Sequence, residues 1–141
     1  MTALDSFSAP VRGWFAEAFG SPTPPQERGW PAIQAGEHTL ILAPTGSGKT
    51  LAAFLWGIDR LGRELAEPVA TAAPQGSTAG AGGVPEPGVR IVYLSPLKAL
   101  NNDIHRNLRV PLRGIRDQGE ELGLPFPEVR AAVRSGDTPA R

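Results

Sequence analysis

Apolar residues along this chain fall into short runs that alternate with helical repeats. The run "HTLILAP" (residues 38–44) is short and enters a glycine-rich turn, which predicts a buried strand. The segment "GKTLAAFLWGIDRLGREL" (residues 48–65) predicts a helix, because its apolar positions recur at helical spacing. These positions are Leu51, Leu55, Ile58 and Leu61, supported by Phe54 and Leu65.

The same alternation continues toward the C-terminus. "VRIVYLSP" (residues 89–96) is β-branched and aromatic and predicts a second strand, and "LKALNNDIHRNLRV" (residues 97–110) predicts a helix that Pro111 ends or restarts. "PEVRAAVRSGDT" (residues 127–138) predicts a third strand running into a turn. Buried strands that alternate with helices imply an α/β fold, with a parallel sheet flanked by helices.

Two further helices and one loop complete the prediction. "VRGWFAEAFG" (residues 11–20) indicates a short amphipathic helix, and "PPQERGWPAIQAGEH" (residues 24–38) indicates another that is broken near Pro31. Residues 66–88 contain many Gly, Pro and small residues, and Glu is their only charged type. Such a segment buries too little apolar surface to offset its ordering entropy, so we expect a flexible loop.

Composition removes several classes of function. Fourteen basic residues balance fourteen acidic ones, so the overall charge names no partner. The absence of cysteine excludes disulfides, thiol nucleophiles and Cys-based zinc sites, and the isolated His38 and His105 do not suggest a metal site. The longest apolar run is far shorter than the roughly 20 residues of a membrane span. With no apolar signal core at the N-terminus, we expect a cytoplasmic protein without membrane contact.

The stretch "APTGSGKT" (residues 43–50) fits the P-loop pattern, with an alanine where the strict form has glycine. Gly46 and Gly48 allow the backbone to turn several N–H groups toward one anion, and the helix that follows adds its N-terminal dipole. Lys49 would neutralise the β- and γ-phosphates, and Thr50 would offer its hydroxyl to Mg²⁺. The context of predicted strand, turn and helix supports a nucleotide-phosphate site.

Gln26 precedes Lys49 by 23 positions. Its side-chain amide can donate to and accept from the adenine edge at once, as Asn and Gln do when they read adenine in DNA. Gln26 is therefore a candidate for selecting ATP over GTP. The residues alone equally allow a glutamine on the surface of a helix.

Basic residues gather after the second predicted strand. Six Lys or Arg stand against one Asp between residues 89 and 116, which suits a phosphate backbone. Lys98, at the start of a predicted helix, is the better contact candidate. The spacing of Arg106, Arg109 and Arg113 favours a solvated helix face.

The chain ends in "RSGDTPAR", where hydroxyls and backbone donors follow a predicted strand. Such a turn suits either phosphate contact or helix capping.

Taken in order, "PTPPQ…GW", "APTGSGKTLAAFLW", "VYLSPLKALNNDIHRNL" and "RSGDTPAR" resemble the opening of superfamily 2 helicases. They look in particular like the large helicase-related (Lhr) type of bacterial and archaeal ATP-dependent DNA helicase. The resemblance covers nearly the whole chain apart from residues 66–88 and the first few positions. After Pro96, this chain reads Leu97-Lys98-Ala99-Leu100, whereas DEAD-box RNA helicases typically show Thr-Arg-Glu-Leu.

The resemblance implies a partial RecA-like P-loop lobe in residues 37–141, preceded by helices and a Q motif in residues 1–36. It makes Gln26 the adenine-reading glutamine, with Phe7 and Phe15 as candidates for the aromatic side chain that packs on adenine. The residues that it implies for ATP and Mg²⁺ are Thr45, Gly46, Ser47, Gly48, Lys49 and Thr50 (to Mg²⁺). Those that it implies for the nucleic-acid backbone are Ser95, Pro96, Leu97 and Lys98, and then Ser135, Gly136, Asp137 and Thr138.

Two parts of such helicases do not occur in these 141 residues. One is the Asp-Glu-x-His motif, which holds Mg²⁺ and positions the attacking water, and the other is a second RecA-like lobe with its arginine finger. We therefore expect this chain alone to bind ATP weakly at best, to hydrolyse it negligibly and to work with a second lobe of its own protein. The implied activity is unwinding of DNA, with single-stranded DNA as partner, in DNA repair. An RNA helicase of the same superfamily and a non-catalytic nucleotide-binding remnant stay open as alternatives.

Overall fold

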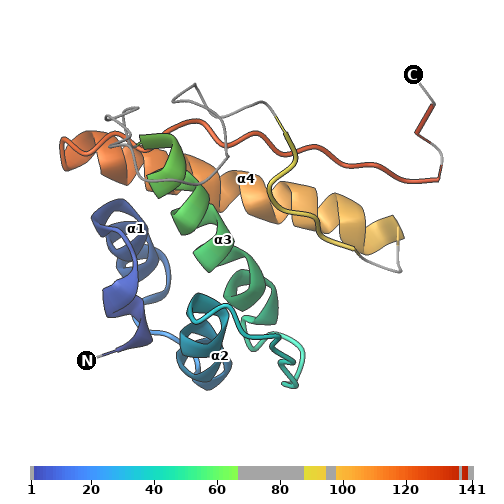
Figure 1. The fold of residues 1–141 in the computed structure, drawn as a ribbon, viewed down its shortest axis with the longest axis horizontal. Helices are drawn as coiled ribbons and strands as arrows, with labels where there is room; N and C mark the ends of the chain where they lie inside the picture. The colour runs from blue at the N-terminus through green and yellow to red at the C-terminus, as the bar shows by residue number, and fades with distance from the viewer. Residues whose placement is uncertain (1, 67–87, 95–97, 137, 140–141) are drawn as a thin grey trace, which may run out of the picture.

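The computed structural model describes residues 2–66, 88–94, 98–136 and 138–139, and for residues 98–107 it describes the backbone alone. Figure 1 shows the helices, with α3 crossing between α2 at one end and α4 at the other. A short 3-10 helix, η1, precedes them. The elements are η1 (Ala3–Ser6), α1 (Ala9–Phe19), α2 (Pro24–Gln34), α3 (Lys49–Ala66) and α4 (Lys98–Glu121). The expected flexible loop at residues 66–88 lies almost wholly outside the described residues.

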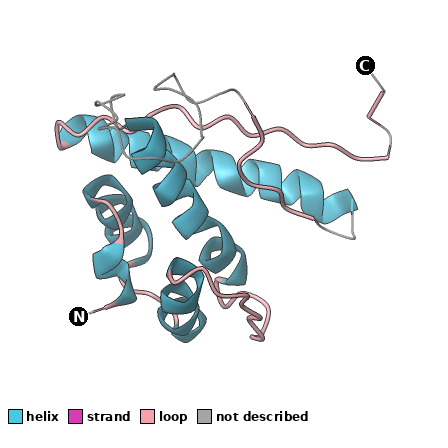
Figure 2. Ribbon diagram, in the orientation of Figure 1, coloured by secondary structure: helices cyan, strands magenta, loops and turns pink. Residues whose placement is uncertain are grey.

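The predicted parallel sheet is not formed in the described part of the chain, where no strand occurs (Figure 2). The expectation of strands at 38–44, 89–96 and 127–138 is therefore wrong for the described residues of these ranges, and residues 95, 96 and 137 lie outside them. Many of their apolar side chains are exposed, with Leu40 and Leu94 at 82% and 87%, whereas Ile41 lies against Gly29 and the Tyr93 ring against Phe54. A strand needs a hydrogen-bonded neighbour along its length, and such neighbours are distant in sequence in a parallel sheet. The described residues supply apolar runs but no pairing between them.

The helices form a shared core. Phe7 and Phe15 lie against Trp30, with ring centroids at 4.8 Å and 5.6 Å. Leu55 of α3 and Ile115 of α4 are fully buried beside them. The predicted apolar face of α3 is confirmed in its first part, where Phe54, Leu55 and Ile58 are buried against neighbouring helices, whereas Leu65 near its end is 40% exposed. None of the described helices is long and apolar enough to cross a membrane.

Two prolines lie inside helices where the sequence predicted breaks. Helix α2 continues through Pro31 and α4 through Pro111, although proline lacks the N–H for the helical ladder. In α4 the turns after Pro111 pack on α1, where the Trp14 indole lies over Gly114. The helix thus continues through Pro111 with its later turns packed on α1, so the prediction that Pro111 ends or restarts it is wrong.

Candidate functional site

The P-loop lies between the irregular segment 38–44 and the first turn of α3. Gly46 and Gly48 both have φ of +81°, a conformation in which a side chain is strained. Because α3 begins at Lys49, the amide groups of Lys49, Thr50 and Leu51 have no helical carbonyl one turn earlier to bond, and Ala52 is the first to donate within the helix, to the Gly48 carbonyl at 2.9 Å. A helix start of this kind presents free N–H groups and partial positive charge, which suits an anion.

Polar side chains close the loop on itself. Lys49 Nζ donates to the carbonyl oxygen of Pro44 over 2.6 Å and also to that of Ala43. Ser47 Oγ donates to the same Pro44 carbonyl at 2.7 Å. Thr50, exposed one residue into α3, carries the hydroxyl expected to meet Mg²⁺. The set of loop amides, an ammonium and a hydroxyl fits a polyphosphate with its cation.

Gln26 is 3% exposed, so its interpretation as a surface glutamine is wrong. Its Oε1 accepts the backbone N–H of Thr23 at 2.9 Å, as the third helical residue does in a capping box. Its Nε2 donates to the carbonyl oxygen of Gly48 at 3.3 Å. Both ends of the amide therefore bond within the chain, one to the start of α2 and one to the P-loop.

Thr23 makes a second tie to the P-loop. Its Oγ1 donates to the carbonyl oxygen of Ser47 at 2.8 Å, next to the carbonyl that Gln26 holds. A Cβ at Gly48 would lie 2.6 Å from Gln26 Nε2 and 3.4 Å from Thr23 Oγ1. Gly48 is thus required both by its backbone angle and by this close approach. The sequence prediction missed Thr23, which a capping-box search around Gln26 would have found.

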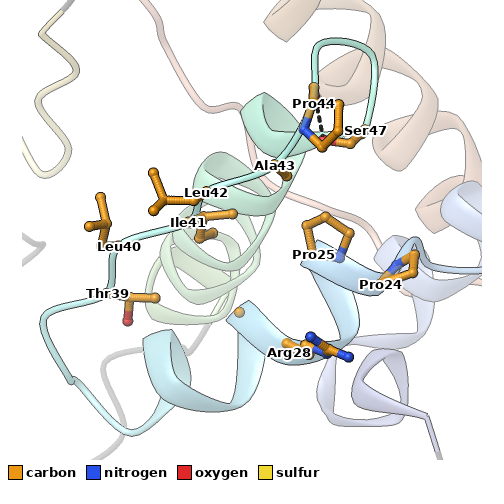
Figure 3. A pocket seen from close by; sticks show the side chains of 11 residues that line it. Pro24, Pro25, Arg28, Thr39, Leu40, Ile41, Leu42, Ala43, Pro44 and Ser47 are labelled. Atoms are coloured by element: carbon orange, nitrogen blue, oxygen red, sulfur yellow. Dashed lines mark hydrogen bonds between the residues drawn. The ribbon is translucent and has the colours of Figure 1, made fainter.

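An open cavity of about 500 Å³ lies beside the P-loop, between the first half of α2 and the segment before the loop (Figure 3). Its size is in the range of small-molecule sites. Its lining is mostly apolar, and Arg28 contributes the one charged side chain of that lining. It is lined by Pro24, Pro25, Arg28, Gly29, Thr39, Leu40, Ile41, Leu42, Ala43, Pro44 and Ser47.

The two aromatic residues expected near adenine are part of the core instead. Phe7 is 2% exposed and Phe15 fully buried, so neither face is open to a ligand. Phe19, the last residue of α1, is 58% exposed and leads directly into the segment that carries Thr23. Its position seven residues before Gln26 was visible in the sequence, but its exposure was not.

The predicted nucleic-acid contacts are only partly described. Four of them lie outside the described residues, namely Ser95, Pro96, Leu97 and Asp137. Lys98 is the first residue of α4.

Ser135 N–H donates to Thr138 Oγ1 at 2.9 Å, and Thr138 N–H donates back to the Ser135 carbonyl. This turn therefore closes on itself, and Gly136 lies inside it, exposed.

The face of α4 behaves as its spacing predicted. Arg109 and Arg113 are exposed, and Arg113 lies 3.9 Å from Asp117 in an ion pair between two solvated side chains. Pairs of this kind contribute little to stability. The side chain of Arg106 lies outside the described part. Within the described residues, no three His, Asp or Glu side chains group as a metal site.

Comparison with known proteins agrees with these features. Residues 23–125 match the family model of the DEAD/DEAH box helicases. The chain is 50% identical over 136 residues to the Lhr helicase of Mycolicibacterium smegmatis, covering 96% of this chain and 8% of that protein. It is 46% identical over 132 residues to the ATP-dependent helicase Lhr-Core protein 2 of Thermococcus barophilus, covering 92% of this chain and 13% of the other.

A solved structure, the Mycobacterium smegmatis helicase Lhr bound to ssDNA and AMP-PNP, matches with a TM-score of 0.79 at 47% identity. The match covers 99% of this chain and 15% of that one, so the chain spans a small part of the relatives it matches. At this identity, the likeness extends to the family as well as to the helicase fold. The chain belongs to the DEAD/DEAH box helicase family and is homologous to its Lhr members.

Proposed function

We propose that this chain is the ATP-binding N-terminal part of an ATP-dependent DNA helicase that couples ATP hydrolysis to movement along single-stranded DNA. The P-loop carries the proposal, because two glycines of positive φ precede the free amides at the start of α3. The solved relative that contains ssDNA and AMP-PNP supports the choice of partners. ATP hydrolysis would supply the free energy for translocation.

Each residue of the loop has a defined task in this proposal. Lys49 exchanges its two carbonyl partners for phosphate oxygens and neutralises their charge. The backbone amides of Thr45, Gly46 and Gly48 hold the remaining oxygens, together with that of Ser47 once it leaves the Pro44 carbonyl, and Thr50 binds Mg²⁺ through its hydroxyl. Gln26 reads the adenine edge through the second hydrogen of Nε2 and the second lone pair of Oε1, so its bonds to Gly48 and Thr23 stay in place.

The other predicted contacts serve the nucleic-acid strand. In this proposal its phosphates are held by two groups of residues. One is the sequence Ser95, Pro96, Leu97 and Lys98, of which Lys98 begins α4, and the other is Ser135, Gly136, Asp137 and Thr138.

We also propose that residues 38–44, 89–94 and 127–134 pair in a parallel sheet completed by further strands of the helicase. This would cover the side chains of Leu40 and Leu94, which are exposed in the present structure.

The test replaces Lys49 by alanine in the helicase that carries this chain and measures ATPase activity and unwinding. We expect ATP turnover to fall about a hundredfold or more, the usual cost of removing one charge-stabilising donor. Lys98→Ala is the matched control, since it removes the same side chain at the proposed DNA contact. It should retain turnover without DNA while its DNA affinity depends less steeply on salt.

Wild-type turnover by Lys49→Ala would overturn the proposed ATP site. Stimulation of the ATPase by RNA in preference to DNA would overturn the DNA assignment and favour the RNA-directed alternative.

A further inference from the structure

The first residues of the chain, residues 2–8, lie across α2 and bond to it at both ends. We call this segment the N-terminal strap. The backbone N–H of Ala3 donates to the Glu27 carboxylate at 2.9 Å, near the start of α2. The side-chain amide of Gln34, the last residue of α2, donates to Ser6 Oγ at 2.6 Å.

The other attachment of the strap is a buried carboxylate of α3. Asp59 is fully buried, and its Oδ1 accepts the backbone N–H of Ser8 at 3.0 Å. Its Oδ2 lies 2.8 Å from Arg63 Nη2, and the same Nη2 donates to the Ser6 carbonyl oxygen at 2.7 Å. A buried ionised carboxylate needs partners that replace water. For Asp59 these partners are the Ser8 N–H of the strap at Oδ1 and the Arg63 guanidinium at Oδ2, which accepts no hydrogen bond from the described residues beyond this ion pair.

Between these attachments, the Phe7 side chain packs into the interface between α2 and α3. Its ring meets Trp30 of α2 edge-on, with centroids 4.8 Å apart, and Trp56 of α3 at 5.6 Å. Trp30 Nε1 in turn donates to the Ala52 carbonyl of α3 at 3.2 Å. The strap thus holds α2 against α3 by polar contacts at its ends and an aromatic contact in the middle.

The start of α2 carries Thr23 and Gln26, which bond two successive carbonyls of the P-loop. A shift of α2 relative to α3 would therefore lengthen or break both of these hydrogen bonds. We propose that Asp59 is a positioning residue for nucleotide binding: by anchoring the strap, it fixes α2 where Thr23 and Gln26 hold the P-loop, and so raises the affinity for a nucleoside triphosphate. This proposal rests on the nucleotide binding proposed above and adds a determinant of affinity more than two helical turns from the loop.

The experiment compares Asp59→Asn with Ile115→Ala in the helicase that carries this chain, using a fluorescent ATP analogue and thermal melting. Asn keeps the size of Asp59 but loses the charge that binds Arg63. Ile115 is fully buried in α4 and has no part in the strap. We expect Asp59→Asn to raise the Kd for the analogue about tenfold, which is a usual size of coupling between separate sites. Ile115→Ala should lower Tm at least as far while leaving Kd within about twofold of the wild type.

A Kd of Asp59→Asn equal to that of the wild type, or a loss matched by Ile115→Ala, would overturn the proposal. If Asp59→Asn does not fold, Glu27→Gln weakens the partly buried bond at the other end of the strap by removing the charge of its acceptor, and the same comparison applies. Amide hydrogen exchange over residues 22–30 separates this inference from the proposed function. If even the wild type binds no nucleotide, the ATP proposal fails. Faster exchange there in Asp59→Asn than in Ile115→Ala still supports the strap, and equal exchange overturns it.

Discussion

Replacing Gln26 by alanine removes both ends of one buried amide and tests its structural role directly. Oε1 no longer accepts the Thr23 N–H, which it does at 2.9 Å, and Nε2 no longer donates to the Gly48 carbonyl at 3.3 Å. The side chain is 3% exposed, so water cannot simply take its place. The start of α2 and the P-loop each lose a partner.

The magnitude follows from the two bonds. Loss of the partner at the helix start costs about 1 kcal/mol, as removal of a capping group does. The bond to Gly48 is long, and such hydrogen bonds contribute about 0.5–1.5 kcal/mol net. We expect the free energy of unfolding to fall by about 2 kcal/mol in total.

The assay is urea denaturation of wild type, Gln26→Ala and the matched control Gln118→Ala. Gln118 bonds Glu17 and Glu121 at 3.1 Å on the surface of α4, so its loss should change stability by less than about 0.5 kcal/mol. Equal stability of the two variants would refute the assignment of the buried amide. In the helicase that carries this chain, Gln26→Ala should lower the ratio of ATP to GTP turnover if Gln26 reads adenine.

Two further substitutions probe the packing and the second P-loop tie. Gly62→Ala places a methyl group inside the van der Waals radius of the Phe126 ring. We expect it to lower the free energy of unfolding by about 1–3 kcal/mol in a thermal melt. Gly136→Ala is the neutral control, because a Cβ there meets nothing within 4 Å. A Tm of Gly62→Ala at or above that of the wild type would contradict the packing. Thr23→Val keeps the side-chain shape but loses the 2.8 Å bond to Ser47; it should cost about 1 kcal/mol. Combined with Gln26→Ala, it should depart from additivity by at least about 0.5 kcal/mol, and strict additivity would show that the two ties act independently.

Local chemistry was sufficient for the P-loop and for α3. The loop requires Gly46 and Gly48 for their backbone angles and Lys49 for its charge. The residue types alone predict both requirements. The apolar spacing of α3 likewise predicts a helix, because the helical period of apolar residues is a local property of the chain. The resemblance to Lhr helicases rested on the same short motifs, and the comparisons confirm it.

Only the tertiary structure decided which side chains are buried and what they bond. Phe7 and Phe15 are core residues and Phe19 is exposed, although all three are phenylalanines near one another in sequence. Pro31 and Pro111 stay inside helices, because contacts from distant segments outweigh their local cost.

The Gln26 amide and the predicted strands show the same limit. Gln26 turns into the protein and bonds the P-loop, where residue type alone allowed a surface position. The apolar runs at 38–44 and 89–94 have the composition of strands but no paired neighbour in the described residues. Composition sets the preference of a segment for strand, whereas a sheet exists only where distant segments meet, and that meeting is a property of the whole fold.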